Sequence, residues 1–184
     1  MKRIAVLGST GSIGTSCLEV IAAHPDRMQL VGITAHSHWE ALARQSREFR
    51  PRWAAVSDAA LEKTAVRGEF FPQTEVLFGS SAIERVASAP EVDVVVSGIV
   101  GAAGLRGTWA AVESGKTVAI ANKETLVVAG GLVMELARRT GATLIPVDSE
   151  HSAVFQAMQA GPRKSGGSCS PPAEGRFGDE PRNN

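Results

Sequence analysis

The sequence has few of the features that mark secreted, zinc-binding or membrane proteins. Its only two cysteines, Cys17 and Cys169, lie in a predicted helix and in a polar tail, so neither a disulfide framework nor a zinc site is indicated. No apolar run approaches the length of a membrane span. The apolar residues 4–7 are too few for the core of a signal peptide. We therefore expect a cytoplasmic protein.

The chain also lacks an excess of charge of either sign. Its 19 basic and 19 acidic residues give a formal net charge of zero. Nothing therefore suggests a nucleic acid or an anionic membrane as a partner. The 184 residues, of which 43% are hydrophobic and 21% charged, have the size and composition of one globular domain, with room for the start of a second.

Short apolar segments alternate with helical patterns along the chain. We expect strands over residues 4–7, 29–34, 53–57, 75–78, 92–97, 117–121 and 142–147. We expect helices over residues 12–23, 39–49, 58–66, 80–88, 105–114, 124–139 and 152–159. The valine-rich segment 92–97 and the apolar segment 142–147 are typical of buried strands. Repeated βα units of this length predict an α/β fold with a doubly wound parallel sheet.

A glycine-rich turn, Gly8-Ser-Thr-Gly11-Ser-Ile-Gly14, joins the first strand to the first helix. In such turns Gly8 permits the tight bend, Gly11 lets the backbone approach a pyrophosphate, and Gly14 allows close packing of helix on strand. The helix N-terminus adds N–H groups and a positive dipole for the phosphates. The strand–turn–helix context predicts a Rossmann-type domain, with a turn that binds no ligand as the alternative.

The end of the second strand favours NADP(H) over NAD(H). An NAD-binding fold normally places an acid there for the ribose 2′-hydroxyl, yet no acid occurs before Glu40. Ser37 and the imidazoles of His36 and His38 can instead meet a 2′-phosphate. The alternative is that these three are solvated loop residues.

Two further loops follow predicted strands and open helices. Small residues fill the loop at 100–105, where they would let the backbone approach a cofactor, although tight packing explains them almost as well. In the second loop Lys123 stands beside a helix N-terminus, where the dipole disfavours a positive charge. It therefore indicates an anionic group to be bound. Glu124 is either functional or an ordinary acid of a first helical turn.

Two carboxylates follow the last predicted strand. Asp148 and Glu150 are two positions apart, so in an extended segment their side chains face the same side. Open α/β sheets bind their ligands at the carboxyl ends of strands. Carboxylate oxygens suit a hard cation, and the pair therefore predicts a site for Mg²⁺ or Mn²⁺.

Together these motifs resemble those of the 1-deoxy-D-xylulose 5-phosphate reductoisomerases, NADPH-dependent enzymes of the non-mevalonate isoprenoid pathway. The matching segments, in the family's order, are residues 8–14 (GSTGSIG), 99–105 (IVGAAGL), 121–124 (ANKE) and 146–153 (PVDSEHSA). The resemblance covers residues 1 to about 161. Within this span the loop at 35–38 departs from the pattern, since it lacks the family's usual Gly and Asn.

The resemblance implies a role for individual residues. It implies that NADPH is contacted by Thr10, Gly11, Ser12, Ile13, Asn122 and Glu124, with Ser37 in the 2′-phosphate loop. It implies that Lys123, Ser149 and Glu150 bind the substrate, that Lys123 and Glu150 are catalytic, and that Asp148 and Glu150 hold Mg²⁺ or Mn²⁺. The implied product is 2-C-methyl-D-erythritol 4-phosphate, formed by rearrangement of the phosphorylated sugar and hydride transfer. The resemblance also implies that a full-length member is a homodimer.

The composition changes abruptly after residue 160. Residues 161–184 contain five Gly and four Pro but no Val, Ile or Leu, so we expect this segment to be disordered. Codons can be chosen for residues 164–178 that, when read two nucleotides later, encode a stretch resembling the family's sequence. We therefore predict a frameshift near Arg163 and Lys164. The coding DNA tests this prediction, since its codons must encode the family-like stretch in the shifted frame. We therefore expect an NADPH-binding domain at 1–147, the beginning of the metal- and substrate-binding domain at 148–160, and an out-of-frame tail.

Compared with a full member, roughly twice as long, the sequence lacks the family's third metal-binding Glu, its phosphate-binding residues and its Trp-bearing loop. We therefore expect an inactive fragment. Two alternatives are a non-catalytic NADP-binding module and another NADP-dependent dehydrogenase of the homoserine type. The run Asp148-Ser-Glu-His argues against the second alternative.

Overall fold

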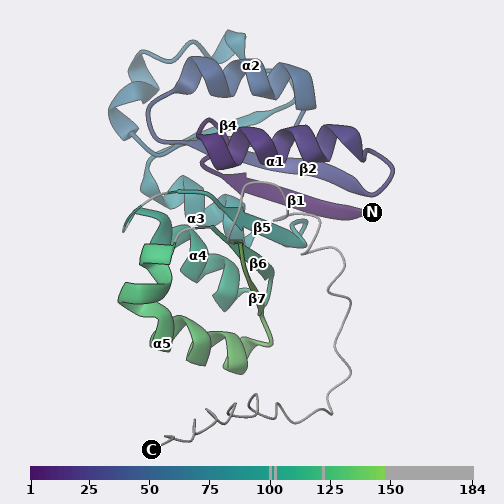
Figure 1. Ribbon diagram of the computed structural model, residues 1–184. Coiled ribbons are helices and arrows are strands. Elements are labelled where there is room, and N and C mark those ends of the chain that lie inside the picture. Colours follow the sequence, from purple (N-terminus) through teal and green to yellow (C-terminus); the bar gives the residue numbers. More distant parts are fainter. Residues whose placement is uncertain (100, 102, 122, 148–184) are drawn as a thin grey trace, which may run out of the picture.

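The computed structural model describes residues 1–99, 101, 103–121 and 123–147; for residues 123–128 it describes the backbone alone. Within this part, the strands form one parallel sheet in the order β4-β3-β2-β1-β5-β6-β7 (Figure 1). The strands are β1 Lys2–Leu7, β2 Met28–Ala35, β3 Trp53–Val56, β4 Glu75–Phe78, β5 Val94–Ser97, β6 Thr117–Ile120 and β7 Thr143–Pro146. The helix expected at 152–159, the start of a second domain expected at 148–160 and the tail expected at 161–184 lie outside the described residues.

Helices cover both faces of this sheet (Figure 1). The α-helices are α1 Ser12–Ala23, α2 Trp39–Phe49, α3 Ser80–Ser88, α4 Ala103–Glu113 and α5 Lys123–Thr140. On one face, α1 and α2 pack on β1, β2 and β3 and enclose one apolar core. On the other face, α3, α4 and α5 enclose a second apolar core. The predicted doubly wound α/β sheet is therefore confirmed.

The valine-rich strand β5 lies inside the sheet, as expected. It pairs with β1 on one side and β6 on the other, and all four of its residues are buried. A strand covered on both faces has no position for a polar residue facing water, and the near-continuous valine run follows from that.

Two of the expectations drawn from the sequence were wrong. Residues 58–66 form no α-helix: a 3-10 turn, η1 Ala59–Lys63, is capped by the Asp58 carboxylate, and a second, η2 Arg67–Glu69, follows. Neither turn has a buried residue, so no apolar face held a longer helix against the sheet. Strand β7 exists but is not buried, because it has β6 as its only neighbour in the described part.

The exposed edge beside β7 is apolar. Leu144 is half-buried, and on α5 Leu132 and Met134 are exposed over 63% and 46% of their surface. A groove of about 350 Å³ runs between α5 and β7. No helix in the described part of the chain is long and apolar enough to cross a membrane.

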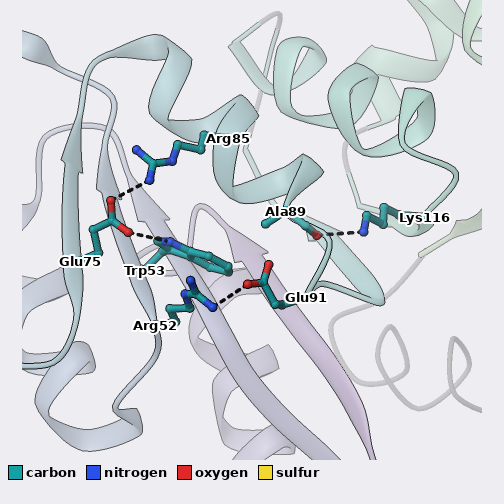
Figure 2. Close-up of polar contacts among 7 residues, drawn as sticks. All are labelled: Arg52, Trp53, Glu75, Arg85, Ala89, Glu91 and Lys116. Carbon is teal, nitrogen blue, oxygen red and sulfur yellow. Dashed lines mark hydrogen bonds and ion pairs between the residues drawn. The ribbon is translucent and has the colours of Figure 1, made fainter.

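Polar side chains lie at the amino ends of the strands, which form what we call the amino edge of the sheet (Figure 2). The Arg52 guanidinium pairs with the Glu91 carboxylate, and Glu75 accepts hydrogen bonds from both Trp53 Nε1 and Arg85. Lys116 Nζ donates to the carbonyl oxygen of Ala89 at 2.8 Å. Side chains of this edge therefore bind one another. The loops predicted to bind ligands lie at the other ends of the strands, the carboxyl edge.

Candidate functional site

The glycine-rich turn lies where the direction of strand order reverses. From β1 the chain winds outward to β2, β3 and β4 on one side and then continues through β5, β6 and β7 on the other. Loops at such a switch point separate from one another, and open α/β sheets bind ligands in the resulting crevice. Here β1 and β5 lie side by side, and their pairing continues to the strand ends, where Gly98 N donates to Leu7 O at 2.9 Å.

Two of the three glycines are required by the fold itself. Gly8 has a φ of +79°, and Gly11 N donates to its carbonyl oxygen at 3.1 Å, which closes the turn. At Gly14 a Cβ would lie 2.2 Å from Gly8 O and 2.5 Å from Ser9 Cα. The structural roles predicted for Gly8 and Gly14, a tight bend and close helix packing, are confirmed.

Gly11 is different, because nothing within the described protein requires it to be glycine. Its φ of −81° and ψ of 172° are extended backbone that any residue adopts. A Cβ there would meet only Gly8 O, at 3.5 Å, which is an ordinary contact. A side chain at this position would fit the described part of the fold, so packing there does not account for the glycine.

The start of α1 has the chemistry of an anion site. Gly11 is the N-cap residue and has no side chain to cap the helix, and the first turn contains no acid. The first N–H groups of a helix have no partner within it, and the dipole places partial positive charge there. The predicted contacts Thr10, Ser12 and Ile13 are exposed or half-exposed around this end. A phosphate group is the ligand that this end of α1 suits best.

The loop after β2 presents the residues predicted to meet a 2′-phosphate. His36, Ser37 and His38 are all exposed. The ring nitrogen Nδ1 of His36 lies 2.8 Å from Ser57 Oγ, and Ser37 O accepts a hydrogen bond from Trp39 N. The imidazole of His36 is therefore held by the neighbouring loop after β3, while Ser37 is exposed.

Sequence analysis missed two residues that support the turn from outside. Thr34, at the end of β2, accepts from Gly8 N through its hydroxyl at 3.0 Å and from Ser9 N through its carbonyl at 2.8 Å. Gln45, on α2, forms two hydrogen bonds with Ser9. Neither residue belongs to a local motif. For Gln45, the one indication in the sequence is a polar residue on the side of a helix that faces the protein.

The remaining predicted residues follow β6 and β7, neighbouring strands that pair Ile120 with Pro146. Lys123 and Glu124 begin α5, but their side chains are not among those described. The positions of Asn122 and of 148–150, which include Asp148, Ser149 and Glu150, lie outside the described residues.

A divalent metal fits the donor chemistry of these residues, since Asp148 and Glu150 supply hard carboxylate oxygens. Across the residues that the structure describes, no group of three or more His, Cys, Asp or Glu side chains is arranged to hold an ion. Cys17 is buried, and this burial raises the pKa of its thiol to about 12, which disfavours the reactive thiolate form.

Comparisons with known proteins match this arrangement. The family model described as 1-deoxy-D-xylulose 5-phosphate reductoisomerase matches residues 4–130. The reductoisomerase of Geobacter metallireducens is 53% identical over 159 residues, which cover 86% of this chain and 41% of that protein. The chain therefore spans about two fifths of the length of this curated relative.

Solved structures of the same kind share the fold. The Zymomonas mobilis reductoisomerase in complex with NADPH is 41% identical, with a TM-score of 0.74, over 84% of this chain and 41% of that one. A DOX-P reductoisomerase with fosmidomycin and magnesium is also 41% identical, with a TM-score of 0.75, over 85% and 39%. The predicted resemblance is confirmed, and the homoserine-type alternative is set aside. The chain belongs to the 1-deoxy-D-xylulose 5-phosphate reductoisomerase family.

Proposed function

We propose that this chain is the cofactor-binding part of a reductoisomerase that uses NADPH and a divalent metal to convert 1-deoxy-D-xylulose 5-phosphate into 2-C-methyl-D-erythritol 4-phosphate. The observation that carries the proposal is Gly11: the fold tolerates a side chain there, yet the position is glycine at an uncapped helix N-terminus. The 41% identity to an enzyme solved with NADPH supports the choice of cofactor.

The residues divide between cofactor and substrate. Thr10, Gly11, Ser12 and Ile13 hold the pyrophosphate at the start of α1, and Ser37, with the two imidazoles beside it, holds the 2′-phosphate. Asn122 and Glu124 complete the NADPH site. The phosphorylated sugar is bound by Lys123, Ser149 and Glu150. A cytoplasmic location and the absence of a nucleic-acid partner remain predictions from the sequence.

The chemistry at the metal is proposed from the donor set. Asp148 and Glu150 would hold Mg²⁺ or Mn²⁺, which supplies Lewis-acid polarisation of the substrate's carbonyl and hydroxyl oxygens when bound. Lys123 contributes positive charge for an anionic group of the substrate, and NADPH supplies the hydride. The resemblance implies three acidic metal ligands, of which Asp148 and Glu150 would be two, and we expect residues 1–184 by themselves to bind cofactor without turnover.

The substitution Gly11→Ala tests the cofactor site. The new methyl group fits the protein but occupies the space where a pyrophosphate would approach the backbone. We expect the dissociation constant for NADPH, measured by nicotinamide fluorescence, to rise about tenfold or more, equivalent to about 1.4 kcal/mol. The midpoint of thermal unfolding should stay within about a degree of the parent's. Unchanged NADPH affinity would overturn the proposed role of this turn.

A second experiment separates an enzyme fragment from a non-catalytic NADP-binding module. NADPH oxidation is followed with 1-deoxy-D-xylulose 5-phosphate and Mn²⁺, first with this chain and then with a full-length relative carrying Asp→Asn at the position equivalent to Asp148. We expect no turnover by this chain, and loss of turnover with retained NADPH binding in the variant. Robust turnover by the 184-residue chain would contradict the proposal that its metal site is incomplete.

A further inference from the structure

The side chain of Gln45 is hydrogen-bonded to the glycine-rich turn from the neighbouring helix α2. Ser9 Oγ donates to Gln45 Oε1 at 2.7 Å, and Gln45 Nε2 donates to Ser9 O at 2.9 Å. Ser9 itself is completely buried. One amide group therefore satisfies both the hydroxyl and the carbonyl of a residue that lies at the centre of the turn.

The bond to the carbonyl has a consequence on the far side of the peptide. Ser9 C=O and Thr10 N–H belong to one planar unit, and in a trans peptide these two groups point in opposite directions. No cis peptide occurs among the described residues. Fixing the carbonyl oxygen toward α2 therefore also fixes the N–H of Thr10 on the opposite side, which is the side away from Gln45.

We propose that Gln45 is a positioning residue for NADPH, acting through the Ser9–Thr10 peptide. It holds this peptide in the orientation that presents Thr10 N–H to the pyrophosphate, and it touches no cofactor atom itself. The proposal rests on the function proposed above, since it assumes that the turn binds NADPH. It assigns part of the site to α2, an element outside the glycine-rich motif.

Gln45 is not needed to hold α2 on the sheet. That contact is made by the fully buried Leu42 and Ala43. Ser46 is also buried, and its hydroxyl accepts a hydrogen bond from Phe71 N at 3.0 Å. Gln45 is only half-buried. Its loss should therefore alter the orientation of the turn more than the stability of the helix packing.

The three variants Gln45→Glu, Gln45→Met and Ser9→Ala separate the two hydrogen bonds. Gln45→Glu keeps the acceptor for Ser9 Oγ but loses the donor to Ser9 O. Gln45→Met loses both bonds without adding charge, which excludes repulsion of phosphate as the cause. Ser9→Ala loses the hydroxyl, with its contacts to Gln45 Oε1 and to Thr34 O, and keeps the bond from Nε2 to the carbonyl. The exposed Gln73→Glu serves as the matched control.

The dissociation constants for NADPH and for adenosine 2′-phosphate, which lacks the pyrophosphate, are measured with each variant of the full chain. We expect NADPH to bind about tenfold more weakly to both Gln45 variants, less than threefold more weakly to Ser9→Ala, and unchanged to Gln73→Glu. Adenosine 2′-phosphate should bind all variants equally. A merely structural role would weaken both ligands together.

The outcomes separate this inference from the function on which it rests. If the parent chain fails to bind NADPH, the proposed function is overturned and this inference with it. If the parent binds NADPH and both Gln45 variants bind it equally well, only the role of Gln45 is overturned. Equal weakening of NADPH and adenosine 2′-phosphate would also contradict it, since the effect would not be confined to the pyrophosphate.

Discussion

At the scale of single residues, the glycines of the turn differ in what surrounds the place where a Cβ would be. Gly14 lies against the backbone of Gly8 and Ser9, which cannot move without opening the turn. Gly11 faces only a carbonyl oxygen at ordinary contact distance. Glycine is therefore required by the fold at position 14, whereas at position 11 the proposed function requires it for binding of the cofactor.

Gly14→Ala should destabilise the folded chain. Its Cβ would lie 2.2 Å from Gly8 O, so either α1 or the turn must shift. Forced shifts of packed backbone cost about 1–3 kcal/mol, which should appear as a lower free energy of unfolding in urea. Gly11→Ala is the matched comparison, with an unfolding free energy close to the parent's. Equal stability of the two variants would contradict the distinction between these glycines.

At the scale of elements, helix α5 contains two glycines with no evident structural purpose. Gly130 and Gly131 lie inside α5, and among the described residues a Cβ at either would meet nothing within 4 Å. Glycine in a helix interior is less stable than alanine because more backbone entropy is lost on folding. Gly141, which follows α5, has equally open surroundings but a φ of +75°.

Alanine at these positions should therefore have opposite effects. Gly131→Ala should raise the free energy of unfolding by about 0.5–1 kcal/mol. Gly141→Ala should lower it by about 1 kcal/mol, because the left-handed conformation is unfavourable for a residue with a Cβ. Urea unfolding of both variants measures the difference. A stabilising Gly141→Ala would show that the turn after α5 can change its conformation.

How far the sequence predicts this fold depends on the element. Strand β5 was predictable because burial on both faces gives a continuous run of apolar residues. Helix α1 was predictable because burial of one face gives apolar residues at helical spacing. Residues 58–66 were not, since helical propensity without an apolar face does not decide between an α-helix and 3-10 turns. The exposure of β7 depends on its place at the edge of the sheet, which apolar residues alone do not reveal.

The site was predictable to a similar extent. Gly8, Gly11 and Gly14 form a local motif whose spacing carries its own geometry. Thr34 and Gln45 support that motif from 26 and 36 residues away along the chain, and neither belongs to a local motif. Contacts of this kind follow from the packing of α2 and β2 around the turn, so only the tertiary structure identifies them.

At the scale of the whole molecule, the two edges of the sheet serve different purposes. The carboxyl edge carries the turn, the loop of His36–His38 and the strand ends that precede Lys123 and Asp148. The amino edge is closed by ion pairs, among which Arg3 and Asp93 join the starts of β1 and β5. These strands flank the switch point, so this pair links the two halves of the sheet on the side away from the proposed site.

Asp93 makes this link with several hydrogen bonds. Its Oδ2 accepts from the backbone N of Arg3 at 2.8 Å and from Arg3 Nε at 3.2 Å, while Oδ1 accepts from the guanidinium at 2.8 Å. Hydrogen bonding from the Arg3 side chain lowers the pKa of Asp93, more than partial burial raises it. The folded state therefore favours the ionised carboxylate more than the unfolded state does.

This lowered pKa determines how stability should depend on pH. An aspartate with a depressed folded pKa stabilises the fold above its unfolded pKa, about 3.9, and the contribution is lost as pH falls through the folded value. Asp93→Asn should therefore lower the urea midpoint at pH 7, and its difference from the parent should narrow below about pH 4. Because the pair lies at the amino edge, NADPH affinity at pH 7 should be unchanged. A loss of affinity in this variant would mean that the two edges of the sheet are coupled through β1 and β5.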